Sequence, residues 1–360
     1  MTLRVKVRKS LGSFTLDVDF EAENETVGLL GASGCGKTMT LHCVAGILRP
    51  DEGRIVLDGT VLFDSERGID LPPQKRRVGL LFQNYALFPN MTVAKNILTV
   101  LALKRKERLL PSLVDRFRLG GLENRYPAQL SGGQQQRAAL ARIMAGEPGA
   151  LLLDEPFSAL DSFLRWQLEG ELLQFLETFG GPALYVSHDR GETYRICARA
   201  CVMDRGRNER IRPVADIFEF PDTLASSILS GCENHSRAER LGGHLLRAVD
   251  WNVNLRCGAG VPDFSPDAFY IGVRASRVRP GGERAGEDEE NLFPCLVLRV
   301  VEDLSSVLAV LRPVGAEGEL SRIRMELPKQ KETPRPGDIL RVAVAPHDIL
   351  PLRGRGGFVT

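Results

Sequence analysis

Eight residues between a short apolar run and a helical pattern limit the possible folds of this chain more than any other segment. They are Gly31, Ala32, Ser33, Gly34, Cys35, Gly36, Lys37 and Thr38, and they fit the pattern G-x-x-x-x-G-K-[ST]. Residues 26–30 predict a strand before them, and residues 37–48 predict a helix after them. Glycines let successive backbone N–H groups turn toward phosphate oxygens, and the start of a helix favours negative charge. The segment is therefore predicted to bind a nucleotide, with Lys37 neutralising the β- and γ-phosphates and the Thr38 hydroxyl binding Mg²⁺.

An acidic pair at the end of a second apolar run supplies the other half of such a site. Residues 150–153 predict a buried strand, and Asp154 and Glu155 follow it directly. We expect Asp154 to lie beside the metal, through a water, and Glu155 to be the general base that polarises the attacking water. The phosphate loop taken alone leaves a kinase or a GTPase open.

Length, charge and cysteine usage narrow the possible partners. The 360 residues favour two domains, and the net charge of +1 argues against a broad nucleic-acid-binding surface. No run of about 18 apolar residues occurs, so no membrane span is predicted. The seven cysteines lack C-x-x-C spacing, which is typical of reduced cytosolic thiols and not of a zinc site.

The order of the predicted elements indicates an α/β domain followed by a β domain. Residues 3–20 and 51–64 alternate as antiparallel strands do, residues 83–146 are mainly helical, and residues 162–179 predict a helix before a buried strand at 183–187. Such a pattern is typical of a mostly parallel sheet covered on both faces. Beyond residue 230, short strands are predicted at residues 268–278, 293–302, 306–312, 323–327 and 339–345. The predicted domains are therefore residues 1–230 and a small β-barrel at residues 231–360.

A third motif points to one class of phosphate-loop protein. Ser131, Gly132, Gly133 and Gln134 follow Leu130 at a predicted helix start, which forms a second anion site with a hydroxyl donor. The run Leu130–Gln134 resembles the signature sequence of ABC ATPases. The resemblance implies that this site closes over the γ-phosphate held by a partner chain, so that two ATP molecules lie between two subunits. A simple Ser-capped helix would explain Ser131 but not the whole run.

Three more residues follow in the order that the ABC family shows. Gln83 resembles the glutamine that links metal and water to the transmembrane partner, and His188 resembles the switch histidine that contacts the γ-phosphate. Ser158 to Asp161 resemble the D-loop that touches the opposite subunit. The resemblance covers about residues 1–230. It implies a RecA-like core with an antiparallel β subdomain and a helical subdomain, and an OB-like, TOBE-type barrel behind them.

The adenine contact departs from the family pattern. The family usually stacks an aromatic ring on adenine from a loop well before the phosphate loop, whereas this short N-terminal segment offers Phe14 or Leu11.

The resemblance implies an ATPase subunit of a bacterial importer, with ATP and Mg²⁺ as cofactors. The resemblance also implies a homodimer at the cytoplasmic face of the membrane, with integral membrane permease subunits and, indirectly, a substrate-binding protein as partners. A soluble ABC ATPase acting on DNA or ribosomes and a purely regulatory ATP-binding module are the rival functions. Against them stand the single cassette and the presence of Lys37, Gln83, Asp154, Glu155 and His188.

The cargo is predicted from one further stretch. Residues 53–79, and residues 61–77 (VLFDSERGIDLPPQKRR) in particular, resemble the matching segment of molybdate importer ATPases. Sulfate or thiosulfate, tungstate, polyamines and sugars are the alternatives.

Cys35 lies inside the phosphate loop at a helix start, a position that lowers the pKa of a thiol. We therefore expect alkylation of Cys35 to inactivate the protein and MgATP to protect it. A buried, inert side chain is the alternative.

Overall fold

The computed structural model describes residues 1–158, 162–258, 260–262, 269–281, 291–329 and 333–354. They form two compact units, Met1–Val214 and Ala215–Thr360. The division comes earlier than the predicted boundary at residue 230, because residues 215–230 contact the rest of the second unit. The guanidinium of Arg274 donates hydrogen bonds to the carbonyls of Phe218 and Ser230, and Thr223 forms a β-bridge with Arg353. The short helices α7 (Val214–Glu219) and α8 (Leu224–Leu229) therefore lead into the second unit.

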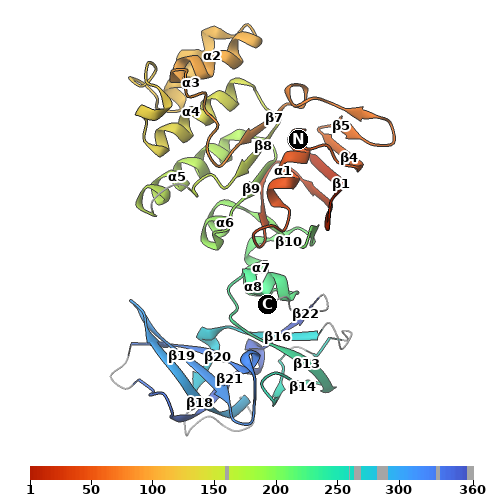
Figure 1. The fold of residues 1–360 in the computed structure, drawn as a ribbon, viewed down its shortest axis with the longest axis vertical. Coiled ribbons are helices and arrows are strands. Elements are labelled where there is room, and N and C mark those ends of the chain that lie inside the picture. The colour runs from red at the N-terminus through yellow and green to blue at the C-terminus, as the bar shows by residue number, and fades with distance from the viewer. Residues whose placement is uncertain (159–161, 259, 263–268, 282–290, 330–332, 355–360) are drawn as a thin grey trace. The chain divides into compact units, whose positions relative to one another are not determined.

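The first unit is built on one mixed sheet (Figure 1). Five of its strands run parallel in the order β7-β8-β9-β3-β10, and these are Val78–Leu81, Ala150–Asp154, Ala183–Val186, Thr26–Leu30 and Arg199–Asp204. The antiparallel side of the sheet comprises β1 (Leu3–Leu11), β2 (Phe14–Ala22), β4 (Glu52–Leu57), β5 (Thr60–Asp64) and β6 (Ile69–Asp70). The short strands β11 (Arg207–Asn208) and β12 (Arg212–Pro213) pair with β10.

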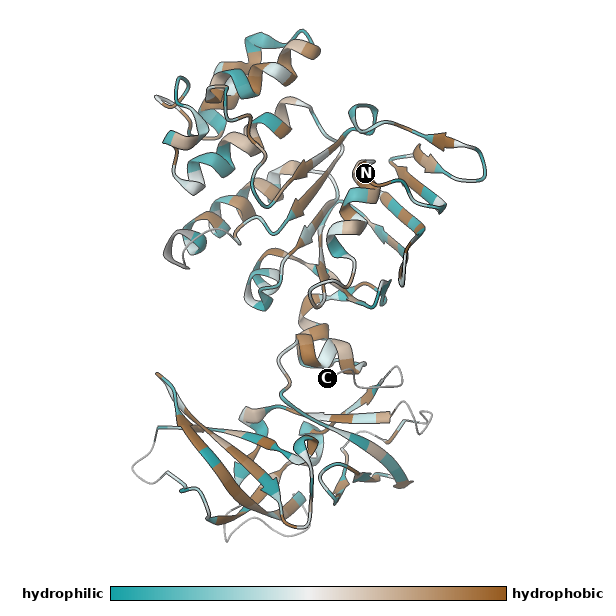
Figure 2. Cartoon of the chain, in the orientation of Figure 1, coloured by the Kyte–Doolittle hydropathy of each residue, from teal (hydrophilic) through white to brown (hydrophobic). Residues whose placement is uncertain are grey.

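Hydropathy separates the two sides of this sheet. All five residues of β8 are buried, whereas β1 alternates buried and exposed positions. Figure 2 shows the same contrast, with β8 almost uniformly apolar and β1 banded. Parallel strands with both faces covered need apolar residues at every position, and half-exposed antiparallel strands need them at every second one.

Helices cover both faces of the parallel strands. Leu152 of β8 packs in one core with α1 (Lys37–Ala45), and its neighbour Leu153 packs in a second core with the later helices. Those helices are α2 (Val93–Leu103), α3 (Leu110–Arg116), α4 (Gly132–Ala145), α5 (Ser162–Phe179) and α6 (Arg190–Ile196). Helices α2, α3 and α4 form the predicted helical subdomain, since α2 packs on both α3 and α4.

The second unit contains two five-stranded antiparallel sheets around one core. The first runs β15-β14-β13-β16-β22, which are Val253–Arg256, Leu245–Ala248, Asn234–Gly242, Phe269–Val273 and Leu350–Arg353. The second runs β17-β21-β18-β19-β20, which are Arg279–Pro280, Ile339–Val344, Asn291–Glu302, Ser306–Pro313 and Ile323–Pro328. Together they make the nearly closed, OB-like barrel that the sequence predicts. Strands β13 to β15 were missed, because charged residues such as Arg237 and Glu239 interrupt their apolar pattern.

Candidate active site

A cavity of about 730 Å³ lies where three parallel strands of the first unit end. The phosphate loop follows β3, Glu155 follows β8, and His188 comes two residues after β9. Because β8 pairs with β9 and β9 with β3, the three segments meet at one edge of the sheet. The predicted residues that line the cavity are Ser33, Gly34, Gly36, Lys37, Thr38, Glu155 and His188.

The phosphate loop needs its glycines for steric reasons. Gly36 has a φ of 107°, and a Cβ there would lie 2.7 Å from the Leu16 side chain. A Cβ on Gly31 would lie 2.5 Å from the carbonyl oxygen of Met203. Within this tight loop the Lys37 ammonium donates to the carbonyls of Gly31 and Ala32, at 2.7 and 3.0 Å. The side chain of Lys37 is thus folded onto the loop that is predicted to hold phosphate.

A hydroxyl and a carboxylate stand side by side at the predicted metal position. Thr38 Oγ1 donates to Asp154 Oδ1 at 3.1 Å, and Asp154 is 7% exposed. Burial raises the pKa of the Asp154 carboxyl, while the Thr38 hydrogen bond and the charge of His42 lower it in part. Two oxygen ligands, one of them on Thr38 at the cavity wall, suit Mg²⁺, which keeps several waters and binds phosphate oxygens.

Glu155 and His188 form the second polar pair of the cavity. His188 Nδ1 lies 3.4 Å from Glu155 Oε2. The backbone of Glu155 adopts a positive φ of 46°, and its N–H donates to the carbonyl of Val186 at 2.9 Å. This hydrogen bond joins the end of β8 to the end of β9, so the carboxylate and the imidazole start from neighbouring backbone positions.

The expectation for the Cys35 thiol was wrong about its pKa. Cys35 is 6% exposed, and burial raises the pKa of its thiol more than the nearby Lys37 lowers it. The Lys37 ammonium is 3.8 Å from the sulfur, and the helix start does not offset the loss of water. Cys35 therefore resembles the alternative, a buried side chain that fills the loop.

The other predicted site residues are not among those that line the cavity, and they are Gly31, Ala32, Cys35, Gln83, Ser131, Gly132, Gly133, Gln134, Asp154 and Asp161. Gln83 is exposed and lies two residues past β7, whose last residue, Leu81, pairs with Leu153 of β8. Ser131 is exposed at the start of α4. Asp161 lies outside the described residues.

The signature run is explained in part by local structure. Ser131 Oγ accepts a hydrogen bond from the Gln134 N–H at 3.4 Å, and Gln134 Oε1 accepts from the Ser131 N–H at 2.9 Å. A Cβ on Gly133 would lie 2.9 Å from the Leu168 side chain, so the close packing against α5 favours a glycine there. Neither contact accounts for Gly132.

Phe14 and Leu11 differ in their surroundings. Phe14 packs against the first core, and its ring is 3.3 Å from where a Cβ on Gly36 would lie. Leu11 is 45% exposed at the end of β1. Neither is among the residues that line the cavity.

Sequence reasoning missed His42, which also lines the cavity. Its ring centroid is 6.3 Å from that of Phe82, and its charge lowers the pKa of Asp154. The spacing could have revealed it, because His42 follows Thr38 by four residues on α1 and so shares its face of the helix.

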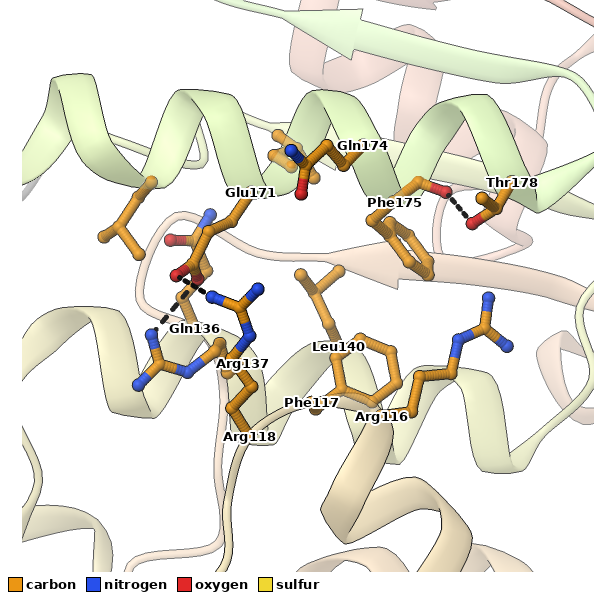
Figure 3. Close-up of a pocket in the computed structure, with 12 residues that line it drawn as sticks. Arg116, Phe117, Arg118, Gln136, Arg137, Leu140, Glu171, Gln174, Phe175 and Thr178 are labelled. Atoms are coloured by element: carbon orange, nitrogen blue, oxygen red, sulfur yellow. Dashed lines mark hydrogen bonds and ion pairs between the residues drawn. The ribbon is translucent and has the colours of Figure 1, made fainter.

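A second, smaller cavity of about 210 Å³ lies between α3, α4 and α5 (Figure 3). Glu171 of α5 accepts hydrogen bonds from Arg118 and from Arg137 of α4, each at 3.2 Å. The amide nitrogen and oxygen of Gln136 are buried and find no partner among the described residues. The Arg137–Glu171 ion pair joins α4 to α5, and the Arg118–Glu171 ion pair joins the segment after α3 to α5.

Known proteins resemble this chain in sequence and in fold. The family model for ABC transporters matches residues 15–158. The chain is 36% identical to a sulfate/thiosulfate import ATP-binding protein of Chromobacterium violaceum, over 90% of this chain and 81% of that protein. It is 36% identical to a spermidine/putrescine import ATP-binding protein of Rubrobacter xylanophilus, over 98% and 93%. A molybdenum import ATP-binding protein of Paramagnetospirillum magneticum is 39% identical over 61% of each chain.

Among solved structures, the dimeric post-hydrolysis state of the ATP-binding cassette MJ0796 bound to ADP and Pi is similar. It covers 59% of this chain and 99% of its own, with a TM-score of 0.50 and 27% identity. Fold and site thus define a phosphate-loop ATPase. Within that class, the chain belongs to the ATP-binding proteins of ABC transporters.

Proposed function

We propose that this chain is the ATP-hydrolysing subunit of an ABC importer and that its cavity at the ends of β3, β8 and β9 is the hydrolytic site. The observation that carries the proposal is the meeting of Lys37, Thr38, Glu155 and His188 in one cavity. The two relatives that this chain matches over most of their length are import ATP-binding proteins, which supports the direction of transport.

Each predicted site residue is given one role in this proposal. Lys37 and the loop N–H groups hold the β- and γ-phosphates. Thr38 and Asp154 would hold Mg²⁺, which neutralises charge that develops on the phosphates. Glu155 accepts the proton of the attacking water, and His188, beside it, contacts the γ-phosphate. Gln83 joins the metal and water to the permease, and Phe14 or Leu11 contacts adenine.

The active form is proposed to be a homodimer. In this chain Ser131 is not among the residues of the phosphate cavity, so its hydroxyl and the start of α4 are available to the nucleotide of a partner. Ser131, Gly132, Gly133 and Gln134 would close over the partner's γ-phosphate, with Asp161 at the same interface. The similar cassette of known structure is dimeric.

Light scattering of Glu155→Gln in MgATP tests this assembly. The variant should accumulate as a dimer, since bound ATP is not hydrolysed, and it should be monomeric without nucleotide. Adding Ser131→Arg should abolish the dimer, whereas Ser131→Thr, which keeps the hydroxyl and the helix cap, should retain it. A monomer at saturating MgATP would refute the shared site.

Transport requires partners that carry the channel. No helix in the described parts of the chain is long and apolar enough to cross a membrane. We propose that the dimer docks on integral permease subunits at the cytoplasmic face of the membrane and that an external substrate-binding protein delivers the cargo. Nucleic acid is not a proposed partner, given the net charge of +1.

Molybdate is the proposed cargo, on the likeness of residues 61–77. In the structure this segment forms the hairpin of β5 and β6, followed by Arg76, whose buried guanidinium donates to Asp70 and to the end of α1. Relatives that import sulfate or thiosulfate, spermidine or putrescine, and molybdenum all match. Sulfate is the nearest alternative.

Reconstitution with the cognate permease and binding protein in lipid vesicles tests the cargo. ATP turnover should rise with added molybdate and not with sulfate or spermidine. Stimulation by sulfate or spermidine without molybdate would overturn the cargo and leave the ATPase assignment intact.

A further inference from the structure

His188 has little packing to hold its imidazole. Its side chain is 65% exposed, and its ring contacts Glu155 at 3.4 Å. An exposed side chain keeps a productive position only if its backbone is fixed, because no surrounding side chains limit its rotamers. The anchors of Ser187 and Asp189, on either side of His188, therefore decide where the ring lies.

One buried carboxylate fixes the residue before His188. Glu192 of α6 is 3% exposed, and its Oε2 accepts hydrogen bonds from the Ser187 hydroxyl at 2.6 Å and the Tyr185 hydroxyl at 2.9 Å. Burial first, and then the charge of Glu192, raises the pKa of Tyr185, so its phenol stays protonated and donates.

The same carboxylate reaches the residue after His188 through Ser187. The Ser187 hydroxyl oxygen accepts from the Asp189 N–H at 3.0 Å, so the chain from Glu192 through Ser187 bridges both neighbours of His188. Asp189 in turn caps α6, accepting from the N–H groups of Gly191 and Glu192 at 2.8 and 3.1 Å.

A guanidinium from α5 holds the free sides of both acids. Arg165 Nη1 lies 3.4 Å from Asp189 Oδ2 and 3.6 Å from Glu192 Oε1. Its side chain is 26% exposed and that of Glu192 is 4% exposed, so the pair is screened less than a surface ion pair.

We propose that Glu192, held by Arg165, is a positioning residue for His188 during ATP hydrolysis. It touches neither the cavity nor the reacting atoms; it acts through the backbone on either side of His188. The proposal rests on the proposed role of His188 in hydrolysis.

A double-mutant cycle on the full-length chain tests it. With Glu192→Gln, which keeps the shape but removes the charge, we expect kcat for ATP to fall about 10- to 100-fold and KM to stay within about twofold, because a 1 Å displacement of a reacting group can cost about 100-fold. If Glu192 acts through His188, the double variant Glu192→Gln/His188→Ala should be no slower than His188→Ala alone. Two independent effects would multiply, and that outcome would overturn the proposal.

Arg195→Gln is the matched control. It breaks another α5–α6 ion pair, the bidentate contact of Arg195 with Glu169 at 2.7 and 3.0 Å, without touching Ser187 or Asp189. It should lower the thermal midpoint and leave kcat unchanged. A loss of kcat in Arg195→Gln equal to that in Glu192→Gln would show that general loosening of α6 is responsible.

A milder variant keeps the test decisive if Glu192→Gln does not fold. Ser187→Ala removes the hydroxyl that joins Glu192 to the Asp189 N–H, and it should lower kcat in the same non-additive way with His188→Ala. Full turnover by Ser187→Ala would overturn the positioning role. Full turnover by His188→Ala itself would overturn the role of His188, and the positioning role with it.

Discussion

Both units of the chain bury polar side chains, but they use them differently. In the first unit Lys37 and Asp154 are each 7% exposed; Lys37 lines the cavity that is proposed to bind MgATP, and Asp154 accepts a hydrogen bond from Thr38, which also lines it. In the second, Asn234 is fully buried and exchanges two hydrogen bonds with the backbone of Arg324, at 2.9 and 2.6 Å. A buried polar group therefore marks a reaction site only when a cavity adjoins it; when backbone groups complete its hydrogen bonds, it holds strands together.

The largest expected effect is the loss of ATP turnover when Glu155 of the first unit is replaced. Glu155→Gln should retain ATP binding but lose turnover by about 10²–10⁴-fold, since a general base contributes about that much. Phosphate release measures turnover, and binding of a fluorescent ATP analogue measures affinity. Glu177→Gln, an exposed charge removal on α5, should match the unmodified protein. Near-native turnover by Glu155→Gln would show that another group is the base.

Asn291→Ala in the second unit should have the opposite effect, which is a loss of stability without a loss of ATP turnover. Asn291 accepts from the Arg256 N–H at 2.6 Å and donates to the carbonyls of Arg256 and Val344 at 3.0 and 3.1 Å. Leaving these groups unpaired should lower the free energy of unfolding of the second unit by about 3 kcal/mol, with ATP turnover unchanged. Fluorescence of the buried Trp251 can follow this unit during denaturation. The exposed Asn254→Ala is the control, and equal destabilisation by both would contradict the role of the buried amide.

A smaller effect is expected on the stability of the second unit as the pH falls. Burial lowers the pKa of His235 from 6.5 to about 4, and its ring is 3.0 Å from the Ser227 hydroxyl. Since the unfolded chain binds this proton more readily, the second unit should be fully stabilised above pH 6.5 and lose stability as the pH falls toward 4. The loss should be about 1–2 kcal/mol, because one pKa unit corresponds to about 1.4 kcal/mol and the ring is partly exposed. His235→Gln should flatten the Trp251 denaturation profile, and the exposed His347→Gln should not.

The smallest expected effect is on the rate at which the Cys35 thiol is alkylated. Because burial raises the pKa of this thiol, little thiolate exists at pH 7, and iodoacetamide should modify Cys35 slowly there and faster as the pH rises above 9. Mass spectrometry of the peptide gives the rate, and MgATP should slow it further. Rapid modification at pH 7 would restore the view that the helix start activates the thiol.

The sequence predicted the parts of the site that lie in one continuous segment or directly after an apolar strand. Lys37 and Thr38 belong to a single loop, and Glu155 and His188 follow runs that are buried at every position. The parallel sheet then brings these segments together, because its strands end at the same edge.

What the sequence did not reveal depends on contacts between distant residues. The link from Arg165 through Glu192 to the backbone beside His188 joins α5 to α6, and neither residue stands in a motif with that meaning. The pKa of Cys35 depends on how deeply the loop is buried, and β13 to β15 depend on pairing that charged residues conceal. Local pattern cannot report burial or register that tertiary packing sets.

The backbone of Glu155 carries a consequence for protein engineering. A left-handed φ of 46° in a residue with a Cβ costs on the order of 1 kcal/mol, which asparagine or glycine would relieve in part. Random libraries of this protein selected for heat resistance alone should therefore enrich replacements at position 155 that cannot hydrolyse ATP. Selection for a more robust transporter ATPase would need an activity requirement at every round, because at this position durability and turnover favour different amino acids.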